Sequence, residues 1–125
     1  VLRLEAPVCL IKNVTKGSYI GYNKTYTNNK EIKVAIIQVG YADAVPLEFS
    51  NNGFVEFRGN KLNILGKVSM DLICVNIDHI NIKKGDKVTV FGGDLTRLEV
   101  ILKDKISTPY TLLTGITNRV KRIYN

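Results

Sequence analysis

A succession of short apolar runs, each closed by a turn signal, is the feature that most restricts how this chain of 125 residues can fold. The runs alternate apolar with polar residues and are rich in Val, Ile and Leu, which is typical of half-buried β-strands. They cover Leu2–Val14, Lys33–Val39, Phe54–Phe57, Leu62–Leu65, Val68–Ile77, Lys87–Phe91 and Arg119–Tyr124. Because turns rich in Gly, Asn and Asp separate these runs, the sequence predicts an all-β domain.

The connections between the runs refine this prediction. Arg58–Lys61 lies between two runs and predicts a β-hairpin, and Asn52-Gly53 predicts a turn with a positive φ angle. Near the end of the chain, Thr108 is a suitable N-cap with Pro109 at the first helical position, which predicts one short C-terminal helix over Thr108–Ile116. Short strands with a single helix favour a small closed or nearly closed Greek-key-type β-barrel, since closure removes exposed sheet edges.

Length and charge limit the class of protein. The length fits one domain, residues 1–125, and the net charge of +7 comes from lysines and arginines that form no block of like charge, which disfavours a nucleic-acid partner. The sequence has no apolar run of membrane-spanning length and no secretory signal, so we expect a cytoplasmic protein without a membrane partner. Because the chain begins with Val in strand-like sequence, we expect a piece of a longer protein.

The two cysteines and the single histidine predict no special chemistry. Cys9 and Cys74 lie far apart in the sequence, without a Cys-x-x-Cys partner, and each sits in an apolar run, so we expect reduced, buried thiols. His79 follows Asp78 close to a turn and is expected to be a solvated loop residue. No metal site is therefore predicted.

Candidate functional residues follow the strand-like run Lys33–Val39. There Gly40–Asp43 places a glycine, a phenol and a carboxylate at the rim of the expected sheet, where a rigid scaffold can hold them. Alone, such a stretch more often marks a strand end with a turn than an active site. Three further features accompany it in the sequence: Gly21–Tyr26 upstream, Gly66–Asp71 downstream and Tyr110 near the expected helix.

In this order and at these spacings, the four features resemble the C-terminal β domain of alanine racemase, and the resemblance extends through Gly85–Val88 and Asn118–Tyr124. It implies a homodimeric isomerase that interconverts L- and D-alanine and supplies D-alanine for peptidoglycan precursors. In that family, pyridoxal 5'-phosphate is bound as a Schiff base to a lysine of an N-terminal (β/α)8 barrel, which this chain lacks. The domain alone is therefore expected to be inactive.

The resemblance also assigns residues to roles. Racemisation needs a base on each face of the cofactor, and Tyr22 matches the family's tyrosine base, supplied to the partner subunit. A phenol titrates near pH ~10, so cationic neighbours or hydrogen bonds must favour the phenolate. Tyr41 matches an entrance residue, while Met70 and Asp71 match residues of the substrate pocket, with the Met70 backbone N–H meeting the substrate carboxylate. Tyr110 matches the tyrosine that binds the cofactor phosphate.

Departures from the family pattern leave two alternatives open. After Asp43 the family usually continues with a glycine, an aromatic and often a basic residue, and after Met-Asp with glutamine; the corresponding residues here are Ala44, Val45, Leu47 and Leu72. These changes would suit a serine or broad-spectrum amino-acid racemase. An alternative from another class is a basic β-barrel module that binds single-stranded nucleic acid and uses its tyrosines as stacking platforms.

Overall fold

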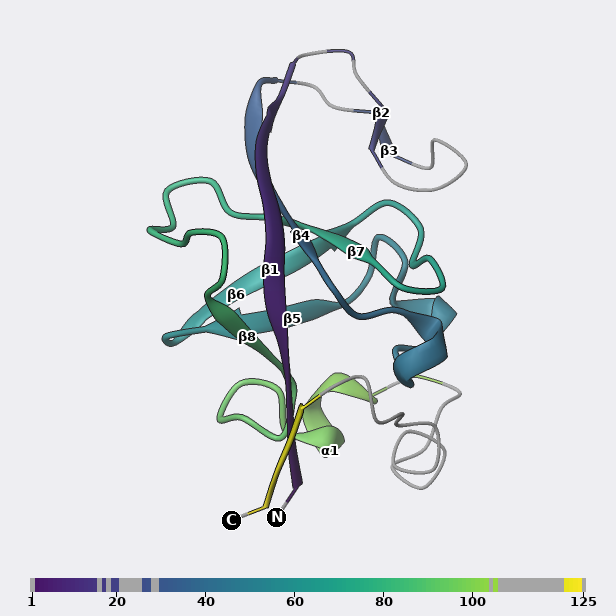
Figure 1. Ribbon diagram of the computed structural model, residues 1–125. Coiled ribbons are helices and arrows are strands. Elements are labelled where there is room, and N and C mark those ends of the chain that lie inside the picture. Colours follow the sequence, from purple (N-terminus) through teal and green to yellow (C-terminus); the bar gives the residue numbers. More distant parts are fainter. Residues whose placement is uncertain are drawn as a thin grey trace.

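A closed ring of six antiparallel strands forms the centre of the molecule (Figure 1). The computed structural model describes residues 2–15, 17, 19–20, 26–27, 30–103, 105 and 121–124. Around the ring, each strand pairs with the next in the order β4-β7-β6-β5-β8-β1, and β1 pairs back to β4. These strands are β1 (Leu2–Val14), β4 (Ile32–Ile37), β5 (Phe54–Phe57), β6 (Asn60–Leu65), β7 (Ile73–Asn76) and β8 (Lys87–Phe91).

The strand order is that of a Greek key. β5, β6 and β7 follow one another as neighbours, β4 lies beyond β7, and β8 returns to lie beside β5. Two further pairings lie outside the ring: β9 (Lys121–Tyr124) adds to β1, and β2 (Tyr19–Ile20) pairs with β3 (Tyr26–Thr27). The predicted fold class, an all-β Greek-key barrel, is confirmed.

The long strand β1 closes the ring because it pairs with both of its ring neighbours, β8 and β4. Its first half pairs with β8 through residues 4–7, and its second half pairs with β4 through residues 8–14. A register shift at Cys9, between the pairs Val8 with Ile37 and Leu10 with Ile36, marks a β-bulge. Bulges bend a strand and increase its twist, which suits a strand that passes from one neighbour to the next. Figure 1 shows β1 running along the length of the molecule.

The main core fills the barrel with alternate residues from all six strands. On β1 these are Leu4, Ala6 and Val8, and on β6 they are Leu62 and Ile64, each at most 3 % exposed. Each of the buried Leu, Ile and Val side chains contributes about 1.5 to 3 kcal/mol by its burial. The other face of β4 is also covered, by a second cluster of five residues: Val14, Ile32, Val34, Leu65 and Cys74. Strand β4 is thus held on both faces, which gives the residues that follow it a fixed support.

Two predicted turns have different outcomes. The β5–β6 hairpin is confirmed, and its tip places Arg58 at φ 49° and Gly59 at φ 82°, as a two-residue hairpin turn requires. The prediction of a positive φ at Asn52-Gly53 is wrong, because the positive φ of 55° falls on Asn51 instead. Gly53 is needed for space, since a Cβ atom there would lie 2.8 Å from the Phe49 side chain.

Helical segments depart from the sequence expectations. The helix predicted over Thr108–Ile116 lies outside the described residues. A short helix that was not predicted, α1 (Leu98–Ile101), follows Arg97. Arginine is not a residue type that marks an N-cap, and the Arg97 side chain makes no capping hydrogen bond. Two 3₁₀ turns, η1 (Tyr41–Asp43) and η2 (Leu47–Phe49), follow β4. In the part of the chain that the structure covers, no helix has the length and apolar character to span a bilayer.

Candidate functional site

The segment after β4 is fastened to the segment before β7 by backbone hydrogen bonds. Tyr41 N–H donates to the carbonyl oxygen of Ser69 (2.9 Å), and Ala42 N–H donates to that of Met70 (3.0 Å). Gly40 permits this approach, because a Cβ atom at its position would overlap the carbonyl oxygens of Ser69 and Met70. Residues 28 positions apart in the sequence are therefore held side by side.

Ser69 shapes the second of these segments into a tight turn. Its hydroxyl donates to the Leu72 carbonyl (2.7 Å) and accepts from Leu72 N–H (3.0 Å), while Ser69 N–H donates to the same carbonyl (3.1 Å). Met70 and Asp71 form the apex of the turn and are exposed. The strand predicted over Val68–Ile77 consequently starts only at Ile73, because the backbone groups of Ser69 and Leu72 are engaged in this turn.

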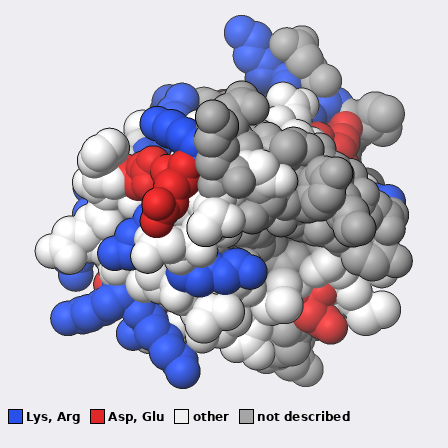
Figure 2. Space-filling view, turned by 90° about the horizontal axis from the view of Figure 1, so that it is seen from above, with Lys and Arg blue, Asp and Glu red and all other residues white. Residues whose placement is uncertain are grey.

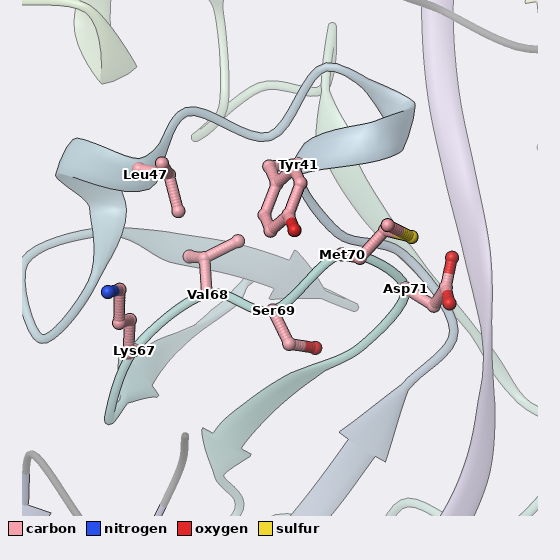
Figure 3. Close-up of a pocket in the computed structure, with 7 residues that line it drawn as sticks. All are labelled: Tyr41, Leu47, Lys67, Val68, Ser69, Met70 and Asp71. Carbon is pink, nitrogen blue, oxygen red and sulfur yellow. The ribbon is translucent and has the colours of Figure 1, made fainter. Parts of the chain in front are cut away.

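A pocket of about 430 Å³ lies between the two segments (Figure 3). Tyr41 and Leu47 extend from η1 and η2 over the segment of residues 67–71. Small-molecule sites commonly have volumes of roughly 300 to 1,000 Å³, so the pocket can hold a small ligand. Its lining residues are Tyr41, Leu47, Lys67, Val68, Ser69, Met70 and Asp71.

The pocket brings together three of the five residues that the sequence selected, namely Tyr41, Met70 and Asp71. Met70 is 52 % exposed, and its backbone N–H donates to no acceptor among the described residues. An amide without an acceptor among the described residues can donate to a carboxylate and carries no titrating proton of its own. Met70 therefore brings a hydrogen-bond donor for a small anionic group to this part of the molecule.

Four lining residues were not selected from the sequence: Leu47, Lys67, Val68 and Ser69. Three of them belong to the Gly66–Asp71 motif, so the motif as a whole was the available signal. Leu47 lies in the stretch that departs from the family pattern. In the sequence, a leucine cannot be told from a core residue, although its side chain is half-exposed in the structure. Tyr22, between β2 and β3, and Tyr110 lie outside the described residues, and their assignments stay predictions.

The thiols and the histidine lie away from this pocket. Cys74 is buried, and desolvation raises its pKa to about 11, with the positive charge of Lys12 acting in the opposite direction. Cys9 was expected to be buried but is only half-buried, where its Sγ donates to the Ile36 carbonyl (3.4 Å). Both cysteines are free thiols. His79 is exposed as expected, and no three potential ligand side chains in the described ranges are grouped as a metal ion would require.

The lysine and arginine side chains of the described residues form no continuous stripe on the face shown in Figure 2. Lysine and arginine side chains are scattered over this face, and acidic side chains lie among them. A nucleic-acid groove would instead concentrate cations along one path next to aromatic side chains. The arrangement on this face does not favour the nucleic-acid-binding alternative.

The fold and the pocket together define a small Greek-key β-barrel domain that presents a ligand-sized site on its rim. Residues 1–124 match the family of the alanine racemase C-terminal domain. The chain is 38 % identical over 120 residues to the alanine racemase of Vesicomyosocius okutanii subsp. Calyptogena okutanii, covering 96 % of this chain and 34 % of that protein.

Solved structures agree with the sequence match. Alanine racemase from Bartonella henselae with covalently bound pyridoxal phosphate superposes with a TM-score of 0.88 at 35 % identity, covering 98 % of this chain and 34 % of that one. Alanine racemase of Clostridium difficile 630 in complex with cycloserine gives a TM-score of 0.85 at 34 % identity, covering 94 % of this chain and 31 % of that one. The chain belongs to the family of alanine racemase C-terminal domains. It spans about a third of the length of the curated relatives it matches.

Proposed function

We propose that this chain is the C-terminal domain of an alanine racemase and supplies one base and part of the substrate pocket for the interconversion of L- and D-alanine. The observation that carries the proposal is the family match over residues 1–124, together with a pocket formed by the motif residues Tyr41, Met70 and Asp71. The alternatives, a serine or broad-spectrum racemase and a nucleic-acid module, gain no support from these relatives.

In the proposed reaction, the Met70 N–H binds the substrate carboxylate, Asp71 lines the same wall, and Tyr41 borders the entrance. Tyr22 exchanges the α-proton on one face of the substrate, and a base on the N-terminal barrel acts on the other. Pyridoxal phosphate, when bound by that barrel, spreads the negative charge left at the α-carbon. Tyr110 contacts its phosphate.

The described pocket fits the edge of such a cofactor site rather than its centre. It offers an amide donor at Met70 and a lysine, Lys67, in its wall, both of which suit anionic groups. The lysine that forms the Schiff base is expected on the barrel domain. This chain therefore completes a site that another domain holds.

An exposed apolar rim, which shares three residues with the pocket lining, supports docking to that other domain. The rim consists of Tyr41, Leu47, Met70 and Leu72, which are between 41 % and 52 % exposed. Clustered apolar side chains of this kind mark interaction surfaces. We propose that the N-terminal barrel covers this rim. We further propose that the full-length protein is a cytoplasmic homodimer that supplies D-alanine for peptidoglycan precursors.

The test is an assay of the full-length protein against L-alanine, D-alanine and a panel of other amino acids that includes L-serine. The proposal predicts that alanine is racemised with the highest kcat/KM and that activity depends on added pyridoxal phosphate. Absence of racemisation of any amino acid by the cofactor-loaded full-length protein would reject it. A kcat/KM that is higher for serine would reject the substrate assignment while keeping the reaction class.

A further inference from the structure

We propose that Asp43 is a positioning residue for the substrate carboxylate, because its buried carboxylate holds the turn whose hydrogen bonds fix the direction of the Met70 N–H. The inference rests on the proposed function, since it takes the ligand of the Met70 amide to be the carboxylate of an amino acid. Asp43 itself does not line the pocket.

The Asp43 side chain is fully buried and is bonded to the backbone of its own turn. Its Oδ2 accepts from Gly40 N–H (3.1 Å), while Asp43 N–H (2.9 Å) and Val45 N–H (3.2 Å) both donate to the Gly40 carbonyl. Both polar backbone groups of Gly40 are thereby fixed. A carboxylate is costly to bury unless it is hydrogen-bonded, so packing alone does not account for an aspartate at this position.

The planarity of the peptide bond carries the effect of this turn to the pocket. The Ser69 carbonyl and the Met70 N–H belong to one peptide unit, and in a trans unit they point in opposite directions. Tyr41 N–H holds the Ser69 oxygen (2.9 Å), and Ala42 N–H holds the next carbonyl, that of Met70 (3.0 Å). The direction of the Met70 N–H is therefore set by residues of the Gly40–Asp43 turn.

The hydrogen bond from Tyr41 N–H to the Ser69 carbonyl also strengthens the Met70 N–H as a donor. A carbonyl that accepts a hydrogen bond polarises the N–H of its own peptide unit, which then binds an anion more strongly. Loss of the Asp43 carboxylate would leave the Gly40 N–H without that acceptor inside the protein. The turn would then shift, Tyr41 N–H would leave the Ser69 oxygen, and the Met70 N–H would lose both its direction and its polarisation.

Glu56 provides a matched control in the same chain. It is 9 % exposed, and its carboxylate accepts a backbone bond from Leu95 N–H (2.7 Å), as Asp43 does from Gly40. Glu56 lies on β5 and borders a different cavity, which Arg3 and Lys87 also line. Removing its carboxylate should lower stability in a comparable way but should leave ligand binding at Met70 unchanged.

The experiment uses the full-length protein as wild type, Asp43→Asn, Asp43→Ala and Glu56→Ala. For each we would measure kcat and KM for L-alanine, the inhibition constant of acetate as a simple carboxylate probe, and Tm. In Asp43→Ala we expect KM and the acetate constant to rise together by about tenfold, the effect of losing one hydrogen bond to a charged group, with kcat within about threefold of wild type.

The conservative variant and the control make the result decisive. Asp43→Asn keeps a neutral acceptor for Gly40 N–H, so both constants should rise only about threefold, between those of wild type and Asp43→Ala. Glu56→Ala should lower Tm but leave KM and the inhibition constant of acetate unchanged. If the Asp43 variants fold and keep the wild-type KM for L-alanine and the wild-type inhibition constant of acetate, the inference is overturned. If Asp43→Ala does not fold, the same two constants of Asp43→Asn decide the question. Failure of the proposed function is distinct, because the wild type would then racemise no alanine.

Discussion

Ala44 occupies a backbone conformation that an alanine rarely adopts. It ends the η1 turn at φ 80° and ψ 10°, in the left-handed region, where the Cβ atom crowds the following carbonyl oxygen. The resemblance to alanine racemases places a glycine at this point of the motif, and only glycine enters this region without steric cost. This chain therefore carries strain at the turn that positions Tyr41.

Ala44→Gly should release that strain. We expect the variant to raise the free energy of unfolding by roughly 0.5 to 1 kcal/mol, the steric gain less the entropy that glycine adds to the unfolded chain. Urea unfolding of the full-length protein would measure the change. Ala42→Gly, in the same turn without a positive φ, is the control and should lower stability; equal destabilisation by both variants would show that Ala44 is not strained.

Burial of the Cys74 thiol predicts a loss of stability at high pH. Its pKa is raised from 9.0 to about 11 by desolvation, so the folded state holds the proton more tightly than the unfolded state. The resulting stabilisation is fully present below pH 9.0 and is lost as the pH rises to about 11. Unfolding at a series of pH values would show a decline that Cys74→Ala lacks. Parallel declines in both proteins would contradict this account.

At the scale of elements, the β5–β6 hairpin depends on the backbone freedom of its tip. Nothing lies within 4 Å of a Cβ atom built at Gly59, so only its φ of 82° opposes a side chain there. Gly59→Ala should therefore cost about 1 kcal/mol through strain alone. Thermal unfolding would measure this, with Asn60→Ala at the adjacent strand end as a comparison. An unchanged Tm for Gly59→Ala would mean that the hairpin tip rearranges freely.

The six strands of the ring were predictable because their core residues recur at every second position, as on β1 and β8, whereas the two-residue strands β2 and β3 were not predicted. The pattern failed where tertiary bonds replaced strand pairing. Apolar alternation continues through Val68–Ile77, but the carbonyls of Ser69 and Met70 accept from the Gly40–Asp43 turn, and no local pattern encodes that contact. Helix α1 was missed for a different reason, since Arg97 at its N-cap is not a residue type that marks a helix start.

At the scale of the whole molecule, the site is assembled from segments distant in sequence and rests on a closed barrel. Motif order selected Tyr41, Met70 and Asp71, and the fold brings them to one pocket. Sequence could not reveal the contribution of Leu47, whose place at the pocket follows from the position of η2. Nor could it reveal the Met70 amide direction, which depends on the bond between Tyr41 and Ser69.

The central claim is that this domain supplies a base to an alanine racemase, and Tyr22→Phe in the full-length protein tests it most directly. The measurement is the rate at which the α-proton of L-alanine and of D-alanine exchanges with deuterium from solvent, with bound cofactor quantified by its absorbance. Tyr19→Phe serves as the matched control. We predict that exchange from one enantiomer falls by about 10²- to 10⁴-fold while cofactor binding persists. Near-wild-type exchange from both enantiomers would contradict the account.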